Sequence, residues 1–210
     1  MTGAVRHPLF ARLYDRMSRA IQAEVAEYRE RLLAGLSGAV VEIGAGNGLN
    51  FPHYPPAVTC VLAVEPEPYL RECARARARA APVPVQVVDS TAETLPVAGA
   101  SHDAAVTSLV LCSVADPARA LAEAYRVVRP GGQLRFFEHV LAEDPRLARA
   151  QRAVDVVWPR LAGGCHAGRD TLAAIRRAGF DVETVERFRF PATRIPLPTS
   201  PHVLGCARRP

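Results

Sequence analysis

The chain has 210 residues, a length that suits one α/β domain and leaves little room for a second. Hydrophobic residues make up 49% and charged residues 22%, which provides a sizeable core and excludes a disordered chain. The formal net charge is +5, and every basic residue is Arg. Because these Arg residues are spread along the chain and form no basic arm, we expect no nucleic-acid partner.

The cysteines are few and scattered, and no two form a CxxC pair. They are Cys60, Cys73, Cys112, Cys165 and Cys206. This spacing predicts neither a disulfide framework nor a zinc site, and it favours a reducing compartment. The first residues lack the apolar core of a signal peptide, and no apolar stretch approaches the roughly 18 residues of a membrane span. We therefore expect a soluble, cytoplasmic protein.

The first expected element is a helix over residues 8–36, because apolar residues recur every four positions from Leu9 to Val25. Short apolar runs and helical stretches then alternate. The expected strands are 39–44, 60–65, 83–89, 102–111 and 133–140, and the expected helices are 66–80 and 117–128. Between the expected helix 117–128 and the expected strand 133–140, Arg129-Pro130-Gly131-Gly132 predicts a tight turn. The alternation predicts a doubly wound α/β fold with a mostly parallel sheet.

A less regular insertion over 142–168 interrupts this alternation. It is rich in apolar side chains, namely Val154, Val156, Val157, Trp158 and Leu161. We expect part of this group to pack on the sheet and the rest to cover its carboxyl edge. A helix over 170–178 follows, capped by Gly179, and then two strands over 180–190 and 201–209. Strands joined by a loop pair antiparallel, so the full prediction is one domain over 1–210 with seven strands and one antiparallel edge strand.

A glycine-rich loop follows the first strand. Glycines stand at alternate positions, Gly44, Gly46 and Gly48, and Glu42 precedes them by two residues. A dinucleotide fingerprint needs glycine where Leu49 stands, and no Lys-Ser/Thr pair of a P-loop follows. At the end of a first strand, such a loop lets a ligand approach the backbone closely, although a plain tight turn is the simpler interpretation.

Glu65 ends the second strand, 17 residues after Gly48. A carboxylate at this point can accept hydrogen bonds from both hydroxyl groups of a ribose. An exposed acid at a strand end is the alternative. Read together with the glycine loop, Glu65 indicates a nucleoside-containing ligand.

These features resemble class I S-adenosylmethionine (SAM) dependent methyltransferases, in particular the methyltransferase type 11 group. Several phrases further resemble its methyltransferase-like 7 branch, whose animal members methylate alkyl thiols. They are LYDRMS (13–18), GNGLNFPHYP (46–55), SLVLCSVAD (108–116), RPGGQLRFFEHV (129–140) and GGCHAGRDT (163–171). The resemblance implies SAM as methyl donor, S-adenosylhomocysteine as product, no metal, and a small lipophilic acceptor. A thiol is one candidate, and oxygen, nitrogen and carbon acceptors stay open.

The resemblance also implies a cofactor site, with residues 1–36 as a helical lid over it. The site residues are Tyr14, Glu42, Gly44, Ala45, Gly46, Asn47, Gly48, Asn50, Glu65, Pro66, Thr91, Ala92, Glu93, Ser108, Leu109 and Ser113. Thr91 stands where the family usually has Asp, so recognition of the adenine rests on the backbone or on Asp89. The animal members carry a membrane-anchoring segment ahead of the match, which leaves peripheral membrane contact as an alternative here.

Two histidines are candidates for removing a proton from the acceptor. His139 ends the fifth strand, and His166 lies in the insertion. Structural packing is the alternative for both, and Cys112 reads as a small core residue. An NAD-dependent oxidoreductase would share the fold and Glu65, but Leu49 disfavours it. The oligomeric state stays open.

Overall fold

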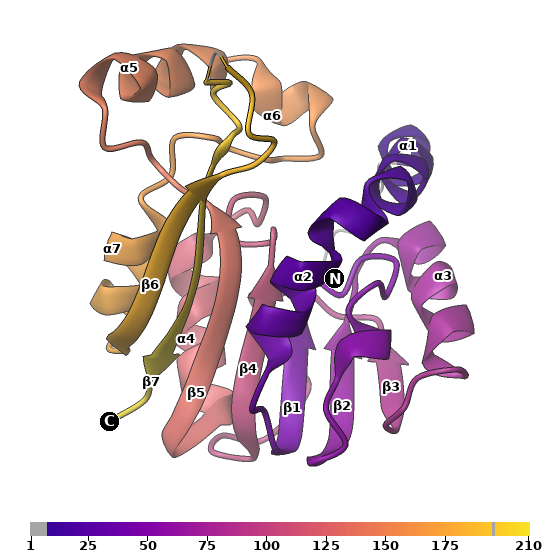
Figure 1. Cartoon of the computed structure of the whole chain (residues 1–210). Coiled ribbons are helices and arrows are strands. Elements are labelled where there is room, and N and C mark those ends of the chain that lie inside the picture. Colours follow the sequence, from indigo (N-terminus) through magenta and orange to yellow (C-terminus); the bar gives the residue numbers. More distant parts are fainter. Residues whose placement is uncertain (1–7, 195) are drawn as a thin grey trace.

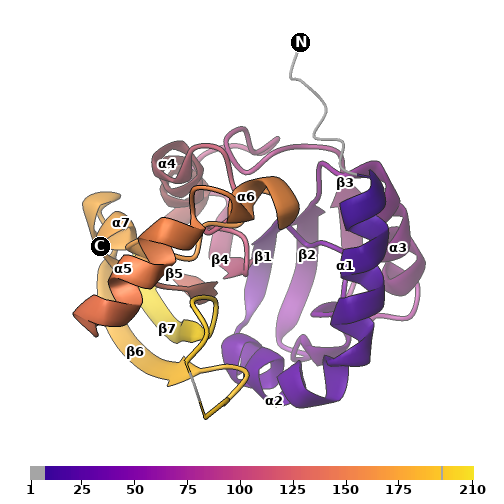
Figure 2. The same ribbon diagram turned by 90° about the horizontal axis from the view of Figure 1, so that it is seen from above.

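A computed structural model describes residues 8–194 and 196–210. Its seven-stranded sheet has the order β3-β2-β1-β4-β5-β7-β6, with helices on both faces (Figures 1 and 2). The strands are β1 (Gly38–Ile43), β2 (Val58–Val64), β3 (Val85–Val88), β4 (His102–Ser108), β5 (Val128–His139), β6 (Asp181–Arg189) and β7 (Pro201–Arg208). The first five pair in parallel, whereas β7 runs antiparallel between β5 and β6. The predicted α/β sheet is confirmed, and its reversed strand lies one position inside the edge.

The helices form two layers and a cap. They are α1 (Pro8–Ala20), α2 (Gln22–Leu33), α3 (Pro68–Ala78), α4 (Pro117–Val127), α5 (Pro145–Val154), α6 (Trp158–Leu161) and α7 (Thr171–Arg177), with a short 3-10 helix, η1 (Phe51–His53). Helix α2 packs against β5 and β7, and α4 packs with α7 on the opposite face. Helices α5 and α6 lie over the carboxyl ends of the strands (Figure 2). Among the described helices, none is both long and apolar enough to cross a membrane.

The core has two parts because the central strands are buried on both faces. Along β1, Val41 and Ile43 point into the cluster beneath α4 and α7, whereas Val40 points into the cluster beneath α2 and α3. Strands enclosed in this way need apolar side chains on both sides. This explains why the sequence shows continuous apolar runs here and not an alternating pattern.

The N-terminal helix differs from the expectation in two ways. It breaks at Ile21, so α1 and α2 are separate helices. The apolar stripe of α1 is exposed: Leu9 is 85% and Leu13 54% accessible. The buried positions of α1 are instead Ala11, Asp15 and Ser18, because that side of the helix lies on the glycine loop.

One further expectation is wrong, and another holds for only part of the residues named. The segment 129–132 is part of β5, because the Gly131 N–H donates to the Arg209 carbonyl and the Arg209 N–H donates to the Gly132 carbonyl. In the insertion, Val156, Val157 and Leu161 are 67%, 55% and 68% exposed, so these side chains do not pack on the sheet. Val156 and Val157 lie in the link between α5 and α6, and Leu161 ends α6.

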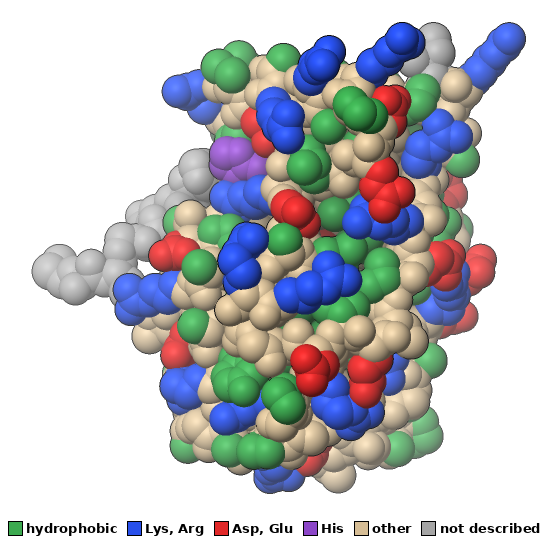
Figure 3. All heavy atoms as spheres, turned by 90° about the vertical axis from the view of Figure 1, so that its left-hand side faces the viewer, with side chains coloured by type: hydrophobic (Ala, Val, Ile, Leu, Met, Phe, Trp, Pro, Cys, Tyr) green, Lys and Arg blue, Asp and Glu red, His purple; other side chains and the backbone are tan. Residues whose placement is uncertain are grey.

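The outer edge of the sheet is strongly charged. Most of β6 is exposed, and its ion pairs join Arg187 to Glu143 and Glu183 to Arg208. Acidic and basic side chains are intermixed over this face (Figure 3). Charged side chains on an edge strand oppose pairing with another sheet, so this edge is protected from aggregation.

Candidate active site

The glycine loop joins β1 to η1, and its three glycines have positive φ angles of +67°, +55° and +79°. A Cβ atom at Gly44 would lie 2.6 Å from a Val110 methyl group, and one at Gly48 would lie 2.7 Å from the Phe51 ring. At Gly46 the nearest atom would be in the Tyr14 ring, at an ordinary 3.5 Å. Close packing therefore requires Gly44 and Gly48, whereas Gly46 is required by its backbone conformation and leaves room above the loop.

Glu65 lies against this loop. Its Oε2 accepts a hydrogen bond from the Gly46 N–H and its Oε1 accepts one from the Glu67 N–H, each at 2.8 Å. The side chain is 5% exposed, and burial raises the pKa of Glu65 to about 7. Each carboxylate oxygen has a further lone pair, so both can still accept from a ligand hydroxyl. Arg71 fixes the strand end by donating to the carbonyls of Glu65 and Pro66.

Glu42 and Asn50 are hydrogen-bonded to each other in the interior of the protein. Asn50 Nδ2 donates to Glu42 Oε1 at 2.8 Å, and the Tyr54 hydroxyl donates to Glu42 Oε2 at 2.7 Å. Arg29 donates to Asn50 Oδ1 at 2.7 Å. Burial raises the pKa of Glu42 to about 7. This network orders the chain on both sides of the glycine loop.

Helix α1 is tied directly to the loop. Asn47 Nδ2 donates to Asp15 Oδ1 at 2.8 Å and to Ser18 Oγ at 2.9 Å, and all three residues are buried. Arg77 from α3 donates to the Asn47 carbonyl. The Tyr14 ring lies beside Gly46, the residue that follows Ala45 in the loop. The structure thus lays α1 over the loop, while residues 1–7 of the expected lid lie outside the described residues.

The segment after β3 is packed on α4. Ala92 is buried in the core, and Glu93 Oε1 accepts a hydrogen bond from the Asp116 N–H at the start of α4. Thr91 is half-buried. Asp89, the alternative partner for an adenine, pairs with Arg71 at 2.9 Å. The backbone of this segment is consequently well fixed, and its acidic side chains have partners in the protein.

The segment after β4 contains a strained residue. Leu109 has a φ of +59°, which side chains other than glycine rarely adopt, and its N–H donates to the Phe137 carbonyl at 2.7 Å. Ser108 ends β4, and the Ser113 N–H closes a turn on the Val110 carbonyl at 2.7 Å. Backbone strain of this kind is held by its surroundings, and here it directs the chain from β4 toward the end of β5.

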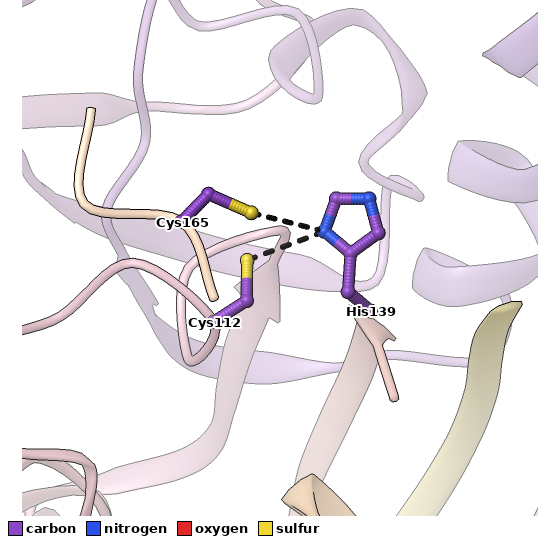
Figure 4. A group of neighbouring side chains, drawn as sticks. All are labelled: Cys112, His139 and Cys165. Atoms are coloured by element: carbon purple, nitrogen blue, oxygen red, sulfur yellow. Dashed lines mark hydrogen bonds between the residues drawn. The ribbon is translucent and has the colours of Figure 1, made fainter. Parts of the chain in front are cut away.

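His139 faces two buried cysteines, which lie together on one side of its ring (Figure 4). Its Nδ1 is 3.4 Å from Cys112 Sγ and 3.6 Å from Cys165 Sγ. The three residues come from the turn after β4, the end of β5 and the insertion, and their ligand-type atoms all lie within 4.8 Å of one another. The hydrogen bond from Cys112 lowers the pKa of Cys165, and His139 acts in the same direction. The hydrogen bond with Cys165 and burial raise the pKa of Cys112, so Cys165 is the more acidic of the two thiols.

His166 has a different environment. Its Nδ1 lies 3.8 Å from Asp155 Oδ2, and its backbone N–H donates to the Cys112 carbonyl at 2.8 Å. The structure therefore places His139, but not the His166 side chain, in the cysteine cluster. The sequence pattern does not single out Cys165, and it predicts a core position for Cys112. The signal that could have found them is that both lie in phrases, 108–116 and 163–171, that carry the family resemblance.

Comparisons with known proteins decide the family. A family model described as a methyltransferase domain matches residues 41–136. Rat thiol S-methyltransferase TMT1B is 34% identical over 95% of this chain and 82% of its own length. Human thiol S-methyltransferase TMT1A is 35% identical over 83% of this chain and 72% of its own length. The chain belongs to the methyltransferase type 11 family. It is a SAM-dependent methyltransferase.

Solved structures show the same fold for this methyltransferase. A SAM-dependent methyltransferase of Thermotoga maritima aligns with a TM-score of 0.69 and 24% identity over 96% of this chain and 98% of that one. Geranyl diphosphate methyltransferase in complex with SAM aligns with a TM-score of 0.70 and 19% identity over 99% and 94%. The match to the methyltransferase domain and to the thiol S-methyltransferases, and not the shared fold, rules out the oxidoreductase alternative.

Proposed function

We propose that the methyltransferase transfers the methyl group of SAM to the sulfur of a small lipophilic thiol. The observation that carries this proposal is the similarity to enzymes named thiol S-methyltransferases, which extends over 95% of the chain in the rat relative. The position of His139 supports it, because this side chain ends β5 at the carboxyl edge of the sheet, where open α/β folds bind ligands.

For the cofactor, we propose that the methionine end of SAM lies over Gly44–Gly48 and that Glu65 accepts the ribose hydroxyls. The positive φ at Gly46 and the free lone pairs of Glu65 support this arrangement. Thr91, with the backbone of Ala92 and Glu93, would meet the adenine. Helix α1 would cover the cofactor, with Tyr14 on the side of Gly46.

The chemistry requires little from the protein beyond alignment and ionisation. SAM is an activated electrophile, so the protein must orient the acceptor sulfur toward the methyl carbon and exclude water. The thiolate is the reactive form of a thiol. We propose that His139 assists loss of the thiol proton, that the insertion over 142–168 provides the acceptor pocket, and that Trp158 contacts the acceptor there.

We also propose one domain over 1–210 and a cytoplasmic location. The three buried free cysteines, Cys112, Cys165 and Cys206, support a reducing compartment. The exposed apolar stripe of α1 leaves peripheral membrane contact as an alternative to a purely aqueous location.

A panel of acceptors tests the function. Purified protein is incubated with SAM and with alkyl thiols, amines, phenols or lipids, and release of S-adenosylhomocysteine is measured together with the mass of the product. We expect turnover with alkyl thiols and a product heavier by one methylene unit. Turnover with an amine, phenol or lipid and none with any thiol contradicts the thiol proposal and leaves the methyltransferase assignment intact.

A further inference from the structure

Three soft ligands converge at the carboxyl edge of the sheet, and no step derived above uses the two sulfur atoms. Cys112 and Cys165 are 1% and 8% exposed, and His139 directs Nδ1 at both (Figure 4). Thiolate and imidazole are the ligands that zinc prefers, whereas magnesium and calcium require oxygen ligands. The donor set therefore selects a zinc-type ion.

The spacing of these atoms fits one tetrahedral ion. With a Zn–S distance of about 2.3 Å and a Zn–N distance of about 2.0 Å, the N-to-S edge of a tetrahedron is about 3.5 Å. The two Nδ1-to-Sγ distances are 3.4 Å and 3.6 Å. Both N-to-S edges therefore match a tetrahedral site, and the two sulfur atoms lie within 4.8 Å of each other, close enough to bind the same ion.

The backbone around the three residues is fixed in advance. Arg169 donates to the carbonyls of Leu111 and Val114 at 2.8 Å, which holds the turn that carries Cys112. The Thr171 hydroxyl donates to the His139 carbonyl at 3.0 Å.

The insertion lies directly against that turn. A Cβ at Gly164 would come within 2.8 Å of the Ser113 carbonyl oxygen, so only glycine allows this approach. Such supporting contacts orient metal ligands and raise affinity.

The position of the cluster relative to the cofactor loop gives the ion a role. Strand β4 is the immediate neighbour of β1, and Val110, two residues before Cys112, contacts Gly44. Structural zinc sites use four protein ligands, whereas catalytic sites use three and leave one position for a substrate. Within the described residues, three candidate ligands are brought together here.

We propose that Cys112, His139 and Cys165 bind one zinc-type ion whose fourth position takes the sulfur of the acceptor thiol. The second half of this proposal rests on the proposed thiol function. It replaces the sequence-based expectation of no metal, because the fold joins cysteines that are far apart in the chain.

The reaction then balances without a redox change. In the ion-bound protein, His139 contributes to thiol ionisation as a ligand of the ion and not as the direct proton acceptor. Binding to the ion releases the thiol proton to water, since a coordinated thiol is deprotonated. The thiolate electron pair forms the new S–C bond to the methyl carbon of SAM. The old C–S bond breaks, and its electron pair stays on the sulfur of S-adenosylhomocysteine. The neutral thioether is a weaker ligand than the thiolate, so product release frees the fourth position.

Cobalt(II) provides a direct probe of the ion site. Reduced, chelator-treated full-length protein is titrated with Co²⁺ under nitrogen, and zinc content is measured separately in protein purified with zinc present. We expect about one ion per chain, a thiolate-to-cobalt charge-transfer band and the strong visible bands of four-coordinate cobalt. Absence of these bands in wild-type protein whose thiols are reduced overturns the ion site.

Cysteine variants locate the site. Cys165→Ser and Cys112→Ser are each expected to lose the charge-transfer band, whereas Cys60→Ser and Cys206→Ser keep it, because these cysteines lie outside the cluster. Thermal melting checks that each variant is folded. Cys165 lies in the insertion loop, so Cys165→Ser provides the test if Cys112→Ser does not fold. Equal band loss in the folded Cys206→Ser control contradicts the assignment.

The open position is tested on the cobalt protein with an alkanethiol. We expect the charge-transfer band to shift and intensify, and an unchanged band overturns the acceptor role. Two outcomes separate the proposals. Full-rate thiol methylation by metal-free protein removes the ion from the mechanism but leaves the thiol function. A cobalt site that forms normally while no thiol is methylated removes the thiol function but leaves the ion.

Discussion

The Gly46 N–H donates to the Glu65 carboxylate across 2.8 Å, so the ends of β1 and β2 are joined through the residues proposed to hold SAM. Replacing Glu65 by Gln keeps the shape and removes the charge. We expect the affinity for S-adenosylhomocysteine to fall roughly 10- to 150-fold in Glu65→Gln, the value of hydrogen bonds to a charged acceptor. Calorimetry measures it, with the exposed Glu72→Gln as control. Equal affinities in a folded Glu65→Gln protein contradict the ribose assignment.

Two glycines separate backbone strain from ligand binding. Gly46 and Gly131 both have positive φ, and a Cβ at Gly131 would meet nothing within 4 Å. Gly46→Val and Gly131→Val should both lose about 1–3 kcal/mol of stability. Only Gly46→Val should abolish cofactor binding, because its side chain would fill the space above the loop. If thermal shift by S-adenosylhomocysteine survives in Gly46→Val, the loop is only a turn.

The role of His139 is visible in the pH profile. The ionised fraction of an alkyl thiol rises with pH, so the acceptor depends on assistance more at about pH 6 than at about pH 9. We expect His139→Ala to lower kcat/KM for a thiol about 100-fold or more at the lower pH and much less at the higher one. His166→Ala, whose side chain lies by Asp155, should show no such difference. A pH-independent loss in His139→Ala would remove His139 from thiol activation.

Variants of Trp158 test whether the insertion contacts the methyl acceptor. Its buried indole N–H is directed at Cys165 and helps to lower the pKa of that thiol, and its ring is half-exposed. We expect Trp158→Ala to raise KM for an alkyl thiol while the Kd for S-adenosylhomocysteine stays within about threefold, because contacts to the acceptor alone are lost. Trp158→Phe should retain most of the acceptor affinity. Parallel losses of both affinities would place Trp158 in the general packing of the cap.

Glu42 makes stability depend on pH. Its pKa is about 7 in the folded protein and 4.5 as the ordinary value, so unfolding releases a proton between these pH values. Stability is therefore lost as pH rises from 4.5 to about 7, by at most about 3 kcal/mol, and stays constant above. Between about pH 5 and pH 8, the Glu42→Gln protein should therefore lose less unfolding free energy than the wild-type protein, by part of that amount. Chemical denaturation at both pH values measures it, and equal losses in the two proteins would show that Glu42 ionises normally.

The parts of the fold that the sequence predicts are those with a local cause. Buried parallel strands need continuous apolar runs, and the bend after β1 needs glycine at Gly44 and Gly48, so both are visible in the chain. The break at Ile21 has no such signal. The outward stripe of α1 was unpredictable because polar contacts of Asp15 and Ser18 with Asn47 decide which side of the helix is buried.

The cysteine cluster was hidden for a different reason. Cys112 and His139 are 27 positions apart in the chain, and so no short motif contains both. Adjacent parallel strands bring their carboxyl ends together, which places the turn after β4 beside the end of β5. The loop that carries Cys165 then closes the cluster from the insertion. Only strand order reveals such a site.

The position of β7 has a consequence for synthesis. Strand β6 emerges from the ribosome before β7, yet β7 is its only pairing partner among the described strands. Until residues 201–208 are made, β6 must wait unpaired beside a nearly finished sheet. Its exposed charges, including Glu183, Glu186 and Arg187, then act during translation, when an apolar strand in the same place would recruit neighbouring nascent chains.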